Sequence, residues 1–383
     1  MASTAVSTQA APAQQVGKPQ PQTTVEAPGG PFLRHTQDGR RAGYDVSSIA
    51  FGGQITQPLP SSPGYIKGFR YHIAATGGVN GTTTVAAAAD APFNCISLLQ
   101  LKDAFGNPIM VGGGYEMLYL VPLFSGGFGL LSAADIKNLP SFSAVSVGTT
   151  GTGDFGFSGY LPLEMSKGYG CISGANAALQ MTLQWNFAAS SSVYSTAPGT
   201  LPTMELRLDP DFYWLPEGNA VEPPGLGTSR QWIIQAANPT IGSGSSQRVQ
   251  FPRLGGYIDT FILVLRDSTG ARIDEWPTRL MFFVDGVPLV DSTVADIEDD
   301  MYAHFGGITR PTGVLAFTRK TSLCQLNLGL LDTGETYLST NPGTLVEVAG
   351  YPWGTITNAP ATLYIIAGQV VPSGSLIQGL PEL

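Results

Sequence analysis

The sequence predicts an all-β protein made of two tandem eight-stranded jelly-roll barrels (a double jelly roll), with short inserted helices and an N-terminal arm. Gly (48 residues) and Pro (29 residues) are abundant, which indicates many turns. Short apolar runs with period-two alternation recur without a helix between successive runs, and this excludes a parallel βαβ sheet. One run, residues 64–73, has a counterpart at residues 256–265 with the same Gly-Tyr-Ile start, which indicates a duplicated unit.

Residues 1–42 form the predicted arm. Ala, Gln, Thr, Ser and Pro dominate it, and its apolar residues have no period, so it does not bury enough surface to fold alone. Four basic residues against two acidic ones give it a charge of +2, and because the whole chain carries −9, the remainder carries −11. A disordered tail and an arm that orders on a neighbouring subunit or an anionic surface both fit this composition. For the second case, the candidate residues for contact with a membrane or a neighbour are Arg34, Arg40 and Arg41.

The first predicted barrel spans residues 43–215. Phe69, Tyr71 and Ile73 alternate with polar residues, which is typical of a half-buried strand. Ser132 begins a predicted short helix, with its hydroxyl as the N-cap and an acidic residue in the first turn. Further strands are predicted at residues 94–101, 155–165, 179–187 and 204–208.

The second predicted barrel spans residues 228–383 and follows a linker at residues 216–227, where three Pro and three Gly interrupt any period. A helix is predicted over residues 293–305, because Val294, Ile297 and Met301 fall on one face at helical spacing. Strands are predicted at residues 232–235, 248–251, 257–265, 279–284, 313–318, 345–349 and 362–371.

Two further pairs of segments repeat in the same order along the halves. Residues 106–109 (Gly-Asn-Pro-Ile) correspond to residues 286–289 (Gly-Val-Pro-Leu), and each follows a strand. Residues 132–136 correspond to residues 293–297, so each half is expected to begin its helix after this hairpin. The order of these matches, rather than any single one, indicates the tandem duplication.

The opening strands of the two halves differ in polarity. Arg70 and His72 of the first copy are replaced by Ile262 and Val264 in the second. We therefore expect the second copy to be buried on both faces, whereas the first leaves one face polar. The two barrels are not expected to be interchangeable, and contacts between subunits are expected at their unlike faces.

The charge of the chain excludes some function classes. Charged residues make up 12% of the chain, the net charge is −9 and the pI is about 4.8. This balance argues against a dedicated nucleic-acid binder, which needs a basic face. Few charges are expected where much of the surface is buried against other subunits, although a surface of Ser, Thr and Gln also fits. The three cysteines, Cys95, Cys171 and Cys324, lack metal spacing and are expected to be free thiols.

The sequence predicts no catalytic residue, no metal site and no cofactor. Its three histidines are scattered. Residues 151–156 match Gly-x-Gly-x-x-Gly but lead from a loop into a strand, so the phosphate-binding geometry fails. The acidic residues within 296–300 are interpreted as a solvated helix face near an N-terminus, and residues 267–270 as a hairpin turn rather than a calcium loop.

The segments described above resemble those of a known family. They are a Gln/Ala-rich arm, a strand with Ile-Lys-Gly-Phe at residues 66–69, and Tyr-Leu-Pro-Leu at residues 160–163 followed by an alternating strand at residues 179–183. The second half adds Gly-Val-Leu-Ala at residues 313–316 and a later strand at residues 345–351. In this order they resemble the double jelly-roll major capsid proteins of tectivirus-like, membrane-containing, tailless double-stranded DNA bacteriophages.

This resemblance implies a structural protein without enzymatic activity. Three copies would form a homotrimer, a pseudo-hexameric capsomer that tiles an icosahedral shell over an internal membrane enclosing the DNA. The implied partners are neighbouring capsomers, minor capsid and vertex proteins, and the internal lipid membrane, which the N-terminal arm would contact; sequence-specific binding of nucleic acid is not implied. The implied location is the virion, after assembly in the cytoplasm of a bacterial host.

Two other functions fit a jelly roll, because the fold alone does not choose between them. The main alternative is a secreted β-sandwich protein that binds carbohydrate or cleaves glycosides; the N-terminal residues do not resemble a secretory signal. The other is a cupin-type metal enzyme, which needs clustered histidines.

Overall fold

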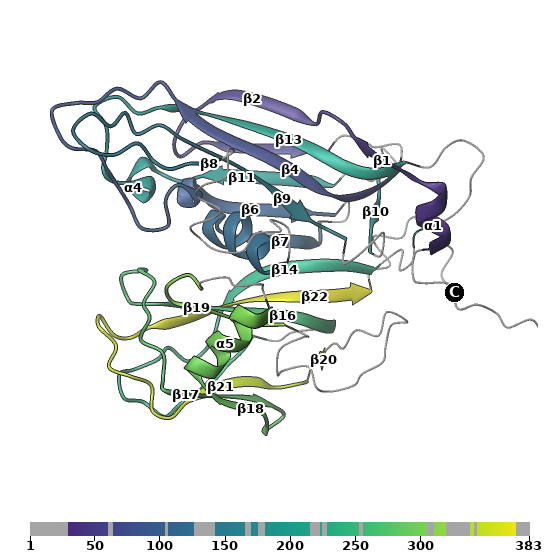
Figure 1. Ribbon diagram of the computed structural model, residues 1–383, viewed down its shortest axis with the longest axis vertical. Coiled ribbons are helices and arrows are strands. Elements are labelled where there is room, and N and C mark those ends of the chain that lie inside the picture. Colours follow the sequence, from purple (N-terminus) through teal and green to yellow (C-terminus); the bar gives the residue numbers. More distant parts are fainter. Residues whose placement is uncertain are drawn as a thin grey trace, which may run out of the picture.

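The computed structural model describes two β-rich halves that lie one above the other, with the strands of both running along the same general direction (Figure 1). The described residues are 30–59, 64–103, 106–125, 142–164, 170–174, 181–214, 223, 228–252, 256–304, 310–318, 338–340 and 343–372. The predicted helix start at Ser132, nearly all of the predicted linker and Cys324 lie outside them. Among these residues, no helix is both long and apolar enough to cross a membrane.

The first half contains two sheets. The strands of its outer sheet, in spatial order, are β2 (Tyr44–Ile49), β13 (Thr203–Trp214), β4 (Gly64–Thr76), β9 (Phe155–Pro162) and β8 (Phe142–Ser143), with β1 (Gln37–Arg40) also pairing with β13 and β10 (Ile172–Ser173) with β4. The facing sheet consists of β3 (Gln54–Pro58), β11 (Thr182–Phe187), β6 (Ile96–Lys102) and β7 (Pro108–Gly112). A short ribbon pairs β5 (Ala86–Ala87) with β12 (Tyr194–Thr196).

The second half repeats this arrangement. One of its sheets consists of β14 (Thr228–Ala236), β22 (Thr362–Pro372), β16 (Gly256–Arg266) and β19 (Val314–Thr318), with β20 (Leu338–Thr340) also pairing with β16. The other consists of β15 (Arg248–Gln250), β21 (Val346–Gly350), β17 (Arg279–Val284) and β18 (Val287–Thr293).

The main strand pairings of the two halves correspond. The expectation that the Gly-Tyr-Ile strand opens each half is wrong, because β2 and β3 precede β4, and β14 and β15 precede β16. We keep the name opening strand for β4 and β16 as the first strands of the repeated motif. Each lies between the last strand of its half, β13 or β22, and β9 or β19. The hairpin β6–β7 corresponds to β17–β18, and β11 and β3 extend the first hairpin as β21 and β15 extend the second. Equivalent pairings in equivalent order are what a duplication of one unit produces.

The two opening strands also share a backbone irregularity. In β4 the register with β13 passes from Gly68 to Ile66, so that Lys67 has no opposing residue. In β16 the register with β22 passes from Thr260 to Ile258, so that Asp259 has none. Both residues directly follow Gly-Tyr-Ile. The β-bulge therefore lies at the same position of the repeated motif, which is stronger support for duplication than the shared letters alone.

The expected difference between the opening strands is confirmed. Arg70 is exposed on β4, whereas Phe261, Ile262, Leu263 and Val264 are all at most 2% exposed on β16. Polar residues alternate along a strand with one wet face, and a continuous apolar run marks a strand covered on both faces. The outer sheet of the first half therefore offers a polar surface that β16 does not.

Helices follow the equivalent hairpins. In the first half the helical segment is η2 (Tyr115–Leu120), continued by α2 (Val121–Phe124), and all of its residues are buried. In the second half it is α5 (Val294–His304), where Thr293 Oγ1 accepts a hydrogen bond from the Asp296 backbone N–H at 3.1 Å and thus caps the helix. The remaining short helices are α1 (Gly30–His35), η1 (Phe93–Cys95) and α4 (Ser190–Val193).

Buried apolar side chains of both halves form one continuous cluster. Three aromatic side chains in or beside it have paired polar groups: Trp185 Nε1 donates to the Tyr44 hydroxyl at 2.7 Å, and the Tyr71 hydroxyl donates to the Leu118 carbonyl at 2.7 Å. The second bond ties the opening strand of the first half to η2. The polar groups of Trp185, Tyr44 and Tyr71 are thus all hydrogen-bonded, as buried polar groups usually are.

Equivalent core substitutions in the two halves should have similar effects. Ile66 and Ile258 occupy the same position of the motif and are 2% and 1% exposed. We expect Ile66→Ala and Ile258→Ala each to lower the free energy of unfolding by about 2–5 kcal/mol, because each leaves a cavity. Val287→Ala, at a side chain 59% exposed, is the matched control and should change little. Denaturant titration followed by tryptophan fluorescence measures all three, and a harmless Ile258→Ala would contradict the equivalence.

Candidate functional site at the junction of the two halves

The halves are joined through their backbones. Strand β7 of the first half pairs in parallel with β14 of the second, with Met110 opposite Trp232 and Val111 opposite Ile233. This contact makes one nine-stranded sheet from β19 on one side to β3 on the other, with β14 and β7 next to each other at its middle (Figure 1). Because both edges are paired there, neither half exposes unsatisfied strand groups at the junction.

A hairpin of the second half reaches across this junction. Strand β16 ends at Arg266, the chain turns through Gly270 at φ +84°, and Arg272 pairs back with Arg266. Asp267 holds the turn: its carboxylate accepts hydrogen bonds from the Thr269 hydroxyl at 2.6 Å and the Thr269 backbone N–H at 2.9 Å, among others. These bonds lower the pKa of Asp267 to about 2. The turn interpretation of residues 267–270 thus agrees with the structure.

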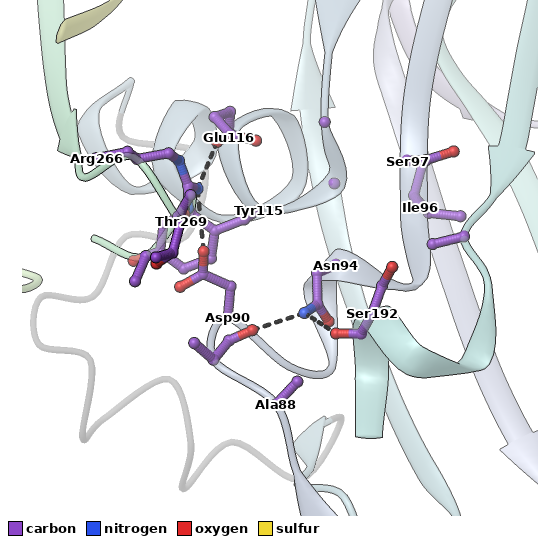
Figure 2. A pocket seen from close by; sticks show the side chains of 16 residues that line it. Ala88, Asp90, Asn94, Ile96, Ser97, Tyr115, Glu116, Ser192, Arg266 and Thr269 are labelled. Carbon is purple, nitrogen blue, oxygen red and sulfur yellow. Dashed lines mark hydrogen bonds and ion pairs between the residues drawn. The ribbon is translucent and has the colours of Figure 1, made fainter. Parts of the chain in front are cut away.

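The two arginines of this hairpin form ion pairs with two carboxylates of the first half; Figure 2 shows those of Arg266. Arg266 Nη2 lies 2.8 Å from Glu116 Oε1 and 3.0 Å from Asp90 Oδ2. Arg272 Nε lies 2.6 Å from Asp90 Oδ1. We call these four residues the junction cluster. Two positive and two negative charges balance, and the four side chains are between 7% and 17% exposed.

The junction cluster lies in a low-dielectric environment. Burial lowers the pKa of Arg266, but the charges of Glu116 and Asp90 outweigh it and leave the pKa above its ordinary value. The Arg272 guanidinium lies over the Tyr115 ring at 4.4 Å from the ring centre, a cation–π contact. Burial raises the pKa of Tyr119 to about 12, against the opposing effect of Arg272. Arg266 therefore stays charged and Tyr119 stays neutral across the physiological pH range.

A cavity of about 510 Å³ opens beside the junction cluster. Figure 2 shows Glu116 and Arg266 at one end of it and Asn94, Ser97 and Ser192 at the other. Small residues line much of the remainder, and at Gly113 a Cβ would lie 2.6 Å from Glu116 Oε2. That glycine lets the Glu116 side chain fold back toward Arg266.

The polar side chains around this cavity hold neighbouring segments together. Its carboxylates are held by arginines, and Asn94 Nδ2 donates to the carbonyls of Ala89 at 2.6 Å and Ser192 at 2.5 Å, which ties two loops together. Within the described ranges, no group of three or more His, Cys, Asp or Glu side chains is placed to hold a metal ion. The arrangement fixes the orientation of one half relative to the other.

The predicted arm residues lie along the first half. Arg34 is exposed on α1, Arg40 ends β1, and the Arg41 backbone N–H donates to the Pro210 carbonyl at 3.3 Å. The arm is anchored here by Phe32, which is 1% exposed and meets the rings of Tyr65 and Tyr213 edge-on at 5.7 and 5.5 Å. From Gly30 onward, the arm is therefore part of the first half.

Two ion pairs reinforce that anchor. Lys67, the bulge residue of β4, lies 2.8 Å from Asp38. Asp211, which is buried, accepts from Arg40 Nε and from Arg70 Nε, each at 2.8 Å. The two guanidiniums remain about half exposed. Asp209 lies opposite Arg70 on β13 and pairs with Arg207 at 3.2 Å, so the arginines of this outer sheet have neighbouring carboxylates.

Other motifs noted in the sequence have structural roles in the described part of the chain. Residues 151–156 lead into β9, as expected. His72 Nδ1 lies 2.7 Å from Ser158 Oγ on the neighbouring strand. Asp296 caps α5 through Thr293, and Glu298 forms an ion pair with Arg310, as expected for a solvated helix face.

The junction cluster itself was not predicted, because its members are far apart in the sequence and belong to no motif. Two signals could have drawn attention to it. Glu116 stands in an apolar stretch that is otherwise uncharged from Tyr115 to Phe124, and Arg266 ends the longest apolar strand of the second half. In a chain with 12% charged residues, a charge inside an apolar stretch indicates a buried partner.

No family model and no curated protein matches the sequence. The fold, however, matches solved structures over nearly its whole length. The crystal structure of the major capsid protein of Sulfolobus turreted icosahedral virus has a TM-score of 0.63 at 12% identity, covering 90% of this chain and 100% of that chain. The PBCV-1 virus capsid protein has a TM-score of 0.58 at 12% identity, covering 88% and 93%. The major capsid protein P2 of bacteriophage PM2 has 0.51 at 10%, covering 88% and 98%.

These neighbours are double jelly-roll proteins, and the likeness establishes that fold for this chain. The predicted fold class is thereby confirmed. Identities of 10–12% show that the fold is shared although the sequences have diverged.

Loss of an ion pair in the junction cluster should lower the free energy of unfolding more than loss of an exposed ion pair. We expect Arg266→Met to lower the free energy of unfolding by about 3 kcal/mol, because Glu116 is left buried without its counter-charge. The control is Arg279→Met. The Arg279 side chain, which pairs with Asp291, is 58% exposed, so this change should lower stability far less. Thermal and denaturant unfolding measure both variants. If both variants lose the same stability, the junction cluster does not stabilise the fold more than an exposed ion pair does.

Acid should remove the contribution of Asp267. Its pKa is lower in the folded chain than the ordinary carboxyl value, so its stabilisation is present above about pH 4 and is lost as the pH falls toward 2. We expect Asp267→Asn to be less stable than the natural chain at pH 7 and the difference to shrink between pH 4 and pH 2. Melting temperatures across this range test it, and a constant difference would contradict it.

Proposed function

We propose that this chain is the major capsid protein of a virus and that it acts as a structural protein without enzymatic activity. One observation carries the proposal: the double jelly roll matches proteins named as viral capsid proteins from end to end, with 90% of this chain and 100% of one neighbour covered. A match of both barrels and of their relative placement is more specific than a match of one jelly roll, a fold that hosts many functions.

The proposed assembly is a homotrimer. Three copies supply six barrels, and because the two barrels of each copy share one strand order, the trimer approximates a hexagon. Such pseudo-hexameric capsomers tile an icosahedral shell. The rigid junction supports this role, since the backbone pairing of β7 with β14 and the junction cluster fix the angle between the barrels on which a regular hexagon depends.

The proposed partners of the arm are an internal membrane and neighbouring capsomers. Arg34, Arg40 and Arg41 lie on or beside a segment that is anchored to the first barrel through Phe32. These three arginines are basic residues within a chain of net charge −9. An anionic bilayer attracts a basic segment on an otherwise acidic protein, so the arm would face the lipid.

The proposed virus is a tailless, tectivirus-like bacteriophage with an internal membrane around double-stranded DNA. The chain would be assembled in the cytoplasm of a bacterial host, together with minor capsid and vertex proteins, and would reside in the virion. Contact with the genome would not be sequence-specific, because the acidic chain has no basic face of the kind that reads DNA.

The assembly state tests this proposal directly. Size-exclusion chromatography with light scattering should give a particle of three times 40.2 kDa, or closed shells visible by electron microscopy. A stable monomer that binds an oligosaccharide would overturn the proposal and favour the carbohydrate-binding alternative.

Substitution in the arm separates the trimer from the shell. The double variant Arg34→Gln/Arg41→Gln retains the Phe32 anchor and the Arg40–Asp211 ion pair, so we expect intact trimers with the melting temperature of the full chain but impaired assembly of shells on membranes. Removal of residues 1–42 also takes away Phe32, Asp38 and Arg40 and should lower the melting temperature as well. Unimpaired shell assembly by the double variant would remove the proposed role of the arm.

A further inference from the structure

One end of the first barrel carries a surface of uncharged loops. Three loops meet there, residues 77–86 after β4, residues 146–153 before β9 and residues 197–202 before β13; we call them the loop platform. None of them contains Asp, Glu, Lys or Arg, and the neighbouring Asp154 is half-buried, where its carboxylate accepts a hydrogen bond from the Gly78 backbone N–H at 2.9 Å. The corresponding loop of the second half, which follows β16, contains four charged residues: Asp267, Arg272, Asp274 and Glu275. The lack of charge is therefore a property of the first barrel and not of the repeated unit.

The loop platform is built by close backbone contacts. Val79 pairs with Thr200 through a β-bridge, and Val85 pairs with Gly148 in the same way. Asn80 donates through Nδ2 to the Thr149 carbonyl, which connects the first loop to the second. The three loops are thus joined to one another before any partner is present.

Glycines allow these contacts. A Cβ on Gly78 would lie 2.0 Å from the Thr152 carbonyl oxygen, and a Cβ on Gly199 would lie 2.8 Å from the Gly81 Cα. Both approaches need the absence of a side chain. The abundance of glycine in these loops therefore reflects packing, and the loops form a defined surface.

Each loop displays one exposed aliphatic side chain. The exposed fractions are 57% for Val79, 53% for Val147 and 38% for Leu201. Single exposed apolar residues are ordinary, but three of them on joined, uncharged loops have the composition of an interface centre, where charges are depleted.

We infer that the loop platform is the contact by which copies of this chain meet around a rotation axis. The inference rests on the proposed trimer and names the surface that closes it. A side chain close to a rotation axis faces its own copies, so any charge there would stand next to identical charges. A chain of net charge −9 tends to repel a second copy, and contact through the uncharged loop platform lessens that repulsion.

Charge insertion tests this inference. Val79→Asp and Val147→Asp, singly and together, would each place identical carboxylates against one another in the trimer. We expect the trimer to dissociate at concentrations roughly 100-fold higher than for the natural chain, because juxtaposed like charges are strongly unfavourable at an interface. Sodium chloride at about 1 M should restore part of the loss by screening. Light scattering over a dilution series gives the mass, and circular dichroism verifies that the monomer remains folded.

The matched control is Val287→Asp. Val287 is 59% exposed at the hairpin tip between β17 and β18 of the second half, so it accepts the same change at the same exposure outside the loop platform. It should leave the trimer unchanged. If it weakens the trimer as much as Val79→Asp does, added charge acts generally and the inference is overturned.

Two outcomes separate this inference from the proposed function. If the natural chain is a trimer and both platform variants assemble equally well, the loop platform is not the contact, while the capsid proposal stands. If the natural chain remains monomeric at every concentration, the proposed trimer fails and the inference fails with it.

Discussion

The parallel pairing of β7 with β14 is the contact on which the rest of the structure depends. It is short, with two residue pairs, yet it turns two sheets into one and thereby sets the barrels side by side. A two-residue ladder alone would permit twisting. The junction cluster removes that freedom, because the β16 hairpin of one half carries both arginines and the other half holds both carboxylates. Backbone pairing therefore gives the connection, and the buried ion pairs fix its angle.

The duplication explains why the halves are alike, and the junction explains why they differ. The bulge after Gly-Tyr-Ile is kept in both opening strands, so the backbone of the ancestral unit is still visible. The side chains have changed where the surroundings changed: β4 faces solvent and carries Arg70, whereas β16 is covered on both faces and is apolar throughout its centre. The first half has in addition acquired an arm strand, β1, which shares β13 with β2.

Sequence patterns predicted the parts of the structure that depend on local alternation. Strand β11 alternates throughout, β13 alternates from Thr203 to Leu208, β4 alternates on either side of its bulge, and α5 places Ile297 and Met301 on one face. The helical segment η2–α2 escaped prediction because all of it is buried, so it has no polar face to produce a helical period.

The junction cluster could not be predicted from such local patterns. Asp90, Glu116, Arg266 and Arg272 meet only through the fold, and a two-residue parallel ladder leaves no mark in the sequence. For the arm, the sequence indicated Arg40 as a candidate for contact with a membrane or a neighbour. It could not show that Arg40 pairs with Asp211 of β13, which also pairs with Arg70 of β4.

The hairpin β17–β18 has a consequence for how such a chain stays soluble while it is made in many copies. Strand β18 is the last strand of its sheet, and an open last strand can recruit strands from other molecules into fibres. Here Pro288 removes one backbone donor, and the register with β17 passes from Val290 to Pro288, so Leu289 bulges out of line. A strand arriving from outside would find neither a regular ladder nor a full set of donors. Addition of strands from other molecules to β18 is thus disfavoured. Copies of the chain would then associate through the surfaces of the folded barrels.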